Sequence, residues 1–184
     1  MRTASQAITE RNQQLSRMHP CERVGLDFLE RAPQRFSNSV DLAVTPDEIW
    51  EVLADAEAWP HWASVITNVT WTSPEPHGIG TTRTVDMRGG IVGDEEFLAW
   101  EPGRHMAFRF NAASTSALAV FVEDYLIEPT PQGCRLTWTL ANRLTGPARW
   151  AVPVSGPLMN LAFRRFLSNL RRYTDQRFAT AGRG

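Results

Sequence analysis

Between residues 36 and 44 apolar and polar positions alternate, with Val40, Leu42 and Val44 on one face. A period of two residues is typical of a half-buried β-strand. The letters T-P-D-E follow at once and combine an N-cap threonine, a proline at the first helical position and a glutamate three residues after the threonine. The pattern predicts a helix that begins immediately after Thr45 and directly follows the strand.

Six further short apolar runs lie between residues 65 and 144, and no helical stripe separates them. Segments rich in glycine and proline stand between most of the runs, as turns do. Short strands in succession without intervening helices predict an antiparallel meander. We expect these strands over residues 65–73, 81–88, 91–100, 105–111, 119–128 and 134–144.

Helical periodicity returns at the end of the chain, where Met159, Phe163, Phe166 and Leu170 recur at steps of three and four residues. Gly-Pro at residues 156–157 is a plausible start for this helix, and we interpret the link from residue 146 to 157 as a flap. Arginines on the opposite face form a basic stripe. It fits either a solvated surface or a contact with an acidic partner or anionic lipid.

The start of the chain divides into two parts before the first strand. Residues 1–19 are polar without a stripe, whereas residues 20–31 mix apolar and charged positions and predict a short amphipathic helix packed on the main domain. We therefore divide the chain into an N-terminal tail and helix at 1–33 and one domain at 34–180. A second short helix is expected at Pro60.

Composition narrows the classes of function. The chain has 19 Lys and Arg against 20 Asp and Glu, a net charge of −1, which argues against a nucleic-acid partner. Cys21 and Cys134 form no C-x-x-C pair, which favours free thiols in a reducing compartment. No segment has the apolar length of a signal peptide core or a membrane span, so we expect a cytoplasmic protein with no integral membrane partner. No metal-ligand spacing or dinucleotide fingerprint occurs, and we expect no metal and no cofactor.

Four segments in order resemble one known family. They are V-T-P-D-E-I-W-E-V-L-A-D at 44–55 with W-P-H-W at 59–62, G-I-G-T-T-R at 78–83, F-L-A-W-E-P-G-R at 97–104, and Y-L-I-E-P followed by G-C-R-L-T-W within 125–138. Together they resemble the SRPBCC or START-like superfamily, and in particular its polyketide cyclase/dehydrase-like branch. The resemblance covers most of the chain.

The resemblance implies an α+β helix-grip fold. In that fold a curved seven-stranded antiparallel sheet and two short helices hold a long C-terminal helix, here with an extra N-terminal helix. It also implies an apolar cavity between the sheet and the long helix, whereas each of these residues taken alone is typical of a packed core. The residues expected to contact a ligand are Trp62, Val85, Met87, Phe97, Phe108, Phe110, Tyr125, Trp138, Met159, Phe163 and Phe166.

Polar residues in the same registers are candidates for chemistry. Glu95, Glu123 and Tyr125 share the periodicity of apolar neighbours, and if they point inward then Glu96 and Asp124 point outward. The sequence leaves this register open. A buried carboxyl has a raised pKa and can serve as an acid or base, whereas on a solvated face it carries no such role.

His61, beside Trp62 at the expected cavity rim, is a further acid–base candidate or else a surface histidine. Three functions remain open. The first is binding or transport of a hydrophobic small molecule, lipid or polyketide-like. The second is a polyketide cyclase or dehydratase that uses these acid–base residues. The third is a protein-interaction module of the co-chaperone or toxin–antitoxin type that uses the N-terminal helix. Whether the chain forms a homodimer also stays open.

Overall fold

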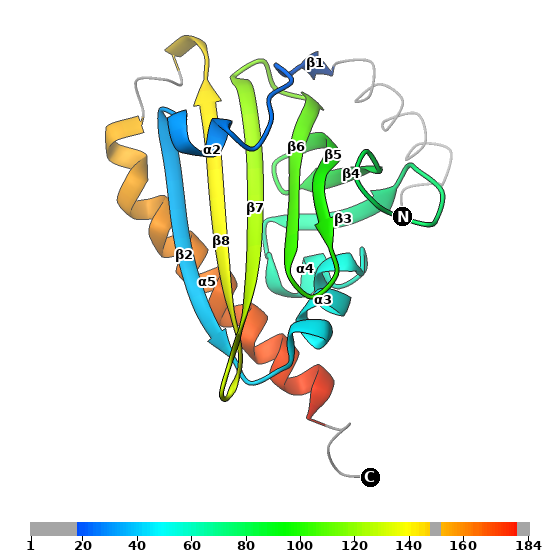
Figure 1. The fold of residues 1–184 in the computed structure, drawn as a ribbon. Helices are drawn as coiled ribbons and strands as arrows, with labels where there is room; N and C mark the ends of the chain where they lie inside the picture. The colour runs from blue at the N-terminus through cyan, green and yellow to red at the C-terminus, as the bar shows by residue number, and fades with distance from the viewer. Residues whose placement is uncertain (1–17, 148–151, 180–184) are drawn as a thin grey trace, which may run out of the picture.

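One curved antiparallel sheet forms the centre of the computed structural model, which describes residues 18–147 and 152–179 (Figure 1). Seven strands follow the order β2-β8-β7-β6-β5-β4-β3, and the two-residue strand β1 pairs with β6. The seven-stranded antiparallel sheet predicted from the meander is confirmed. The strands are β1 (His19–Pro20), β2 (Gln34–Leu42), β3 (Ile66–Trp71), β4 (Thr82–Met87), β5 (Ile91–Glu101), β6 (His105–Ala113), β7 (Leu118–Thr130) and β8 (Gly133–Leu144).

Helices α3 (Pro46–Ala54) and α4 (Trp59–Trp62) connect β2 to β3. The predicted cap of α3 is present: the Glu48 amide donates to Thr45 Oγ1 at 3.2 Å, and the Thr45 amide donates to Glu48 Oε2 at 2.8 Å. Each partner satisfies a backbone N–H that has no acceptor within the helix. This reciprocal cap sets the start of α3 where its sequence predicts it.

The long helix α5 (Val152–Phe178) crosses one face of the sheet (Figure 1). It begins four residues before the expected Gly156, and a proline at residue 153 falls in its first turn, where the missing N–H would have no partner in any case. The flap expected over 146–157 is therefore helical from Val152 onward, and residues 148–151 lie outside the described part of the chain.

The amphipathic helix expected over residues 20–31 is not formed, and only one helical turn, α2 (Phe28–Arg31), is present. The backbone upstream bonds to the sheet instead: Cys21 N donates to Asn111 O at 2.9 Å, and Glu22 N donates to Ala119 O at 2.8 Å. Pairing between β6 and β7 stops at Arg109 and Val122, and β1 occupies the free edge of β6 beyond that point. Pairing with distant strands has thus replaced the local helix. The interaction-module hypothesis relied on that helix.

The N-terminal segment does pack on the domain. Val24 and Phe28 contact Val120, Val122 and Ala141 on the face of the sheet opposite α5 (Figure 1). The main hydrophobic core lies on the other face, between the sheet and helices α3, α4 and α5. The sheet is therefore covered on both sides around β7 and β8.

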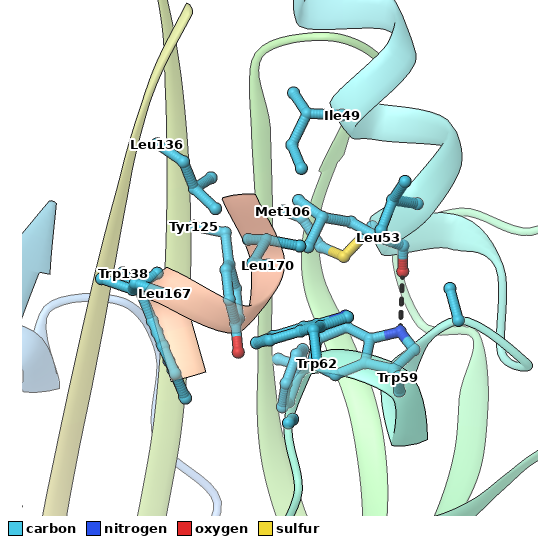
Figure 2. Packing of buried hydrophobic residues seen from close by; sticks show 14 of the residues in the cluster. Ile49, Leu53, Trp59, Trp62, Met106, Tyr125, Leu136, Trp138, Leu167 and Leu170 are labelled. Carbon is cyan, nitrogen blue, oxygen red and sulfur yellow. Dashed lines mark hydrogen bonds between the residues drawn. The ribbon is translucent and has the colours of Figure 1, made fainter. Parts of the chain in front are cut away.

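Aromatic side chains fill the middle of that core (Figure 2). Trp59 packs against Trp62 with ring centroids 4.9 Å apart, and its indole Nε1 donates to the carbonyl of Leu53 at 3.0 Å. Tyr125 and Trp138 stack at 5.4 Å on neighbouring strands β7 and β8. The W-P-H-W segment is thus anchored in the core by both of its tryptophans.

Candidate functional site

A charged pair lies inside the core. Arg83 on β4 and Glu95 on β5 are cross-strand partners, with only 1% and 3% of their surfaces exposed, and Arg83 Nε donates to Glu95 Oε2. A buried charge is strongly unfavourable unless an opposite charge pairs with it. Burial raises the pKa of the Glu95 carboxyl above its ordinary value, and the Arg83 guanidinium opposes that shift.

Aromatic rings enclose the rest of the Arg83 guanidinium. Its Cζ lies 4.4 Å from the ring centroid of Trp59, 4.8 Å from that of Phe108 and 4.9 Å from that of Phe97. Ring faces at such distances attract a cation, and the attraction grows when water is excluded. Within the described residues Arg83 Nη1 has no hydrogen-bond partner. The rings therefore replace part of the hydration that the guanidinium lost.

A second polar pair lies on β7. Tyr125 and Glu123 both point inward and are both buried, and the Tyr125 hydroxyl donates to Glu123 Oε2 at 2.5 Å. Burial raises the pKa of Glu123 to about 8; the hydrogen bond from Tyr125 opposes the shift, and the charge of Glu95 adds to it. Burial also raises the pKa of Tyr125 well above its ordinary value. At neutral pH Glu123 is therefore mainly a carboxylic acid and Tyr125 a neutral phenol.

The two pairs differ in charge because only one of them contains a cation. Glu95 contacts the Arg83 cation directly, and that contact opposes the rise in its pKa, whereas the nearest polar partner of Glu123 is the neutral phenol of Tyr125. We call Arg83, Glu95, Glu123 and Tyr125 the buried polar cluster. Two carboxyls held in different environments are a recurring arrangement at acid–base sites.

The neighbouring carboxylates point to the other face, so the register left open by the sequence is resolved. Glu96 accepts from Arg109 Nη2 and from Asn111 Nδ2, both at 2.9 Å. Partial burial alone would raise the pKa of Glu96, but these hydrogen bonds lower it below the ordinary value. Asp124 lies 2.6 Å from His105 Nε2, and this contact raises the pKa of His105.

An apolar cleft of about 400 Å³ lies at one end of the inner face. Its walls come from β2, β8, the β4–β5 hairpin, the connection between β6 and β7, and α5. Three of the residues expected to contact a ligand line it: Met87, Phe110 and Met159. The full lining is Gln34, Phe36, Met87, Ile91, Phe110, Thr115, Ala117, Leu118, Phe121, Leu140, Asn142, Leu144 and Met159.

The other residues expected to contact a ligand lie in the packed core and outside this lining. Trp138 meets Phe163 edge to face with ring centroids 4.2 Å apart, so helix and sheet touch at the middle of the inner face. Aromatic volume thus fills the central space, and the open space is displaced toward the start of α5. The residues in the core are Trp62, Val85, Phe97, Phe108, Tyr125, Trp138 and Phe163, with Phe166 packed at its margin.

His61 is exposed on α4 and lies apart from the buried polar cluster. Its ring stacks on Tyr173 of α5 with centroids 5.4 Å apart and an interplanar angle of 8°. It borders a polar surface groove together with Asn169, Arg172 and Gln176. The structure therefore brings together Glu95, Glu123 and Tyr125 of the four acid–base candidates, and leaves His61 on the surface.

Arg83 and Asn142 are among the buried polar residues that sequence reasoning missed. Both carried a signal, since Arg83 shares the two-residue register of Val85 and Met87, and Asn142 that of Leu140. A charged or amide residue on an apolar face is the mark of an internal polar group.

Other site classes find no support in the described residues. Across 18–147 and 152–179, no three His, Cys, Asp or Glu side chains are grouped so that they could hold a metal ion. In the same ranges no helix combines the length and the apolar character needed to cross a membrane. The buried polar cluster and the apolar cleft are the features that offer groups for binding or catalysis.

Comparison with known proteins agrees with this architecture. An uncharacterized protein of Mycobacterium tuberculosis is 67% identical over 164 residues, covering 89% of this chain and 98% of the relative. A START superfamily protein from Mycobacterium smegmatis has a TM-score of 0.59 at 16% identity, covering 80% of this chain and 98% of that one. The di-domain ARO/CYC StfQ of the steffimycin biosynthetic pathway has a TM-score of 0.65 at 11% identity, covering 83% and 55%.

The two structural likenesses concern the fold alone. The family model described as "Polyketide cyclase / dehydrase and lipid transport" matches residues 33–175, which is most of the chain. The helix-grip arrangement of sheet and long helix is the one expected from the sequence resemblance. The chain belongs to the polyketide cyclase/dehydrase and lipid transport family.

Proposed function

We propose that the protein binds a small hydrophobic molecule, lipid or polyketide-like, in the apolar cleft between β2, β8 and α5. The observation that carries this proposal is the cleft itself: about 400 Å³, with walls of apolar side chains and few polar groups. Pockets for small molecules commonly have this size and this composition. The family description, which includes lipid transport, supports the same class of ligand.

The physical argument is the exposure of apolar walls to water. Phe36, Met87 and Met159 line the cleft and stay half-buried, because α5 rests on the sheet further along, where Trp138 meets Phe163. Apolar surface removed from water contributes roughly 25 cal/mol per Å². A ligand of matching volume would remove these walls from water without displacing any side chain.

Binding of Nile red, a neutral apolar dye that fluoresces when it leaves water, tests the proposal. Two residues permit a matched pair of variants, since Ile91 at the cleft is 39% exposed and Leu126 on the outer side of β7 is 41% exposed. We expect Ile91→Arg to weaken dye binding at least tenfold, because it places a charge at the cleft wall. Leu126→Arg should bind the dye as the wild type does. Absence of binding to the wild type, or equal binding by both variants, would refute the proposal.

A second candidate function is acid–base catalysis on a polyketide-like ligand, and one observation favours it. Glu123 is the cross-strand partner of Leu140, and Glu95 is the partner of Phe110; both of these apolar residues line the cleft. A protonated carboxyl therefore lies one residue pair away from the space proposed for the ligand. Such a group can donate a proton to a carbonyl or hydroxyl oxygen as a cyclase or dehydratase requires.

Glu123→Gln separates the two candidates. The amide keeps the shape of the side chain and removes its proton-donating ability. Under the binding function the variant should retain full affinity for Nile red and for a polyketide-like ligand. Under the catalytic function it should retain affinity but lose cyclisation or dehydration of such a ligand by at least a hundredfold, followed by mass spectrometry. Turnover by neither protein would leave binding as the function.

A further inference from the structure

Two large apolar side chains near the start of α5 are exposed. Leu158 is 68% exposed and Leu161 is 64% exposed, although α5 packs its other face on the sheet. Exposed apolar residues that stand singly are common on protein surfaces. These two lie three residues apart on one helix and therefore share its outer face. Packing within the fold gives no reason for this apolar stripe.

The same outer face continues into two arginines. Arg164 and Arg165 follow Leu161 by three and four residues, and both are exposed. In the part of the chain that the structure describes, neither side chain forms a hydrogen bond or an ion pair. Arg171, further along α5, differs because its Nε donates to the Asp41 carbonyl at 3.0 Å. Arg164 and Arg165 therefore present two positive charges without a bonded partner.

Leu158, Leu161, Arg164 and Arg165, which we call the docking face, suit one kind of partner. No Asp or Glu occurs on α5 before Asp175, so a second copy packed helix to helix would set arginines against arginines. An anionic lipid surface offers phosphates to the arginines and an apolar layer to the leucines. Amphipathic helices that lie in the membrane interface combine the same two attractions.

The docking face borders the apolar cleft. Met159, the residue after Leu158, lines the cleft, and Ile91 on another of its walls is 39% exposed. A surface that covers the docking face therefore lies beside the cleft. Contact with a lipid surface would bring the cleft next to the layer in which hydrophobic molecules dissolve.

We propose that α5 docks on an anionic lipid surface, with Leu158 and Leu161 entering the layer between headgroups and acyl chains and with Arg164 and Arg165 on lipid phosphates. The proposal goes beyond the binding function, because it names the surface at which the protein meets a hydrophobic ligand. Docking requires only the outer face of α5 and does not depend on what fills the cleft.

Co-sedimentation of the full-length protein with vesicles tests the docking. The vesicles consist of phosphatidylcholine, with or without phosphatidylglycerol as the anionic lipid. We expect binding at least tenfold tighter when phosphatidylglycerol is present. Raising the salt from about 0.1 M to about 1 M should weaken that binding severalfold, because the Debye length falls from about 10 Å to about 3 Å.

The leucines are tested by the double variant Leu158→Ser with Leu161→Ser. It should bind the anionic vesicles at least tenfold more weakly, because two leucine side chains no longer leave water on docking. The control is Ile79→Ser with Leu126→Ser, which removes two other exposed apolar residues, 73% and 41% exposed, and should bind as the wild type does. Equal affinity of the two double variants would contradict docking through α5.

The arginines are tested by Arg164→Gln with Arg165→Gln, which should weaken binding to the anionic vesicles about fivefold for each arginine removed. The control, Arg31→Gln with Arg104→Gln, makes the same change in net charge at side chains that are 63% and 80% exposed and lie outside α5. It should bind nearly as the wild type does. An equal loss in both double variants would show that net charge, and not the docking face, determines the binding.

Two further outcomes would overturn the proposal: equal or absent binding to the two kinds of vesicle, and a dimer in solution that the leucine variant abolishes while vesicles are not bound. Nile red binding without vesicles tests the proposed function separately, and the leucine variant should bind the dye as the wild type does. A wild type that binds anionic vesicles but not the dye would overturn the proposed function alone. A wild type that binds the dye but not the vesicles would overturn the docking alone.

Discussion

Tyr125 donates a hydrogen bond of 2.5 Å to Glu123, two positions earlier on β7, and neither side chain has appreciable contact with water. Residues two apart on a strand share a face, so β7, an interior strand, carries a phenol and a carboxyl next to each other on the inner face of the sheet. Burial holds the proton on that carboxyl at neutral pH, since its pKa is raised to about 8. The relationship makes the stability of the fold depend on pH.

Glu123→Gln should remove part of that dependence. The unfolded carboxyl loses its proton near 4.5 and the folded one near 8, so between these values the unfolded state binds fewer protons and stability falls as pH rises. The variant should match the wild type at pH 4 and exceed it at pH 9 by on the order of 4 kcal/mol, since one pKa unit corresponds to about 1.4 kcal/mol. Urea unfolding across this range measures the difference.

Glu96→Gln is the control for that experiment, because hydrogen bonds lower the pKa of Glu96 in the folded state. A carboxyl whose pKa is lowered on folding stabilises the fold at pH values above its ordinary pKa. This contribution is lost as the pH falls through the lowered pKa. The control should therefore lose stability relative to the wild type at neutral pH. A Glu123→Gln variant whose stability tracks the wild type at every pH would contradict a protonated Glu123.

Arg83→Met should strongly destabilise the fold, because it leaves the Glu95 carboxylate buried without its cation. Breaking one side of a buried ion pair costs about 3–5 kcal/mol. Adding Glu95→Gln should restore much of the loss. Chemical unfolding of the two single variants and the double variant gives the interaction energy directly.

The exposed pair between Arg135 and Asp41, with Arg135 Nε 2.7 Å from Asp41 Oδ1, is the matched comparison. Water screens charges at the surface, so Arg135→Met should change stability far less than Arg83→Met. Equal losses from the two arginine substitutions would mean that burial of the inner pair has no energetic consequence.

Gly93→Ala should narrow the cleft. A Cβ at residue 93 would lie 2.4 Å from Cζ of Phe110, so the phenyl ring must move. Forcing an extra carbon into a packed site costs about 1–3 kcal/mol, and the displaced ring should also weaken Nile red binding severalfold. Gly78→Ala, where the new carbon meets nothing within 4 Å, should change neither property. Unaltered dye binding by Gly93→Ala would show that Phe110 is not part of the ligand contact.

Thr45→Ala should cost about 1 kcal/mol of stability, because it removes the side chain that accepts from the Glu48 amide at the start of α3. Thermal unfolding measures the loss. Thr67→Ala also removes a threonine hydroxyl, but from an exposed position on β3, and it serves as the comparison. A cap that stabilises α3 requires the first substitution to lower the melting temperature more than the second.

Local sequence patterns predicted the helices and strands well where these depend on neighbouring residues in the chain. The capping box of Thr45 and Glu48 predicted the start of α3 to the residue, and the alternation of each run predicted the strands to within a few residues at their ends. The helix expected over 20–31 failed because backbone groups there found partners on distant strands. Periodicity cannot detect such pairing, since it describes one segment at a time.

The candidate site divides along the same line. Sequence alone determined the order of elements from residue 34 onward, the family, and three of the buried polar residues (Glu95, Glu123 and Tyr125), because these follow from spacing and local preference. Tertiary structure decided that Glu95 and Glu123 rather than Glu96 and Asp124 lie inside, a register set by pairing across the sheet and by a bulge beside Glu95. It also decided where the open space lies. Whether a cavity stays empty depends on how aromatic volumes from distant elements meet, and here they fill the centre and leave a cleft beside Asn142.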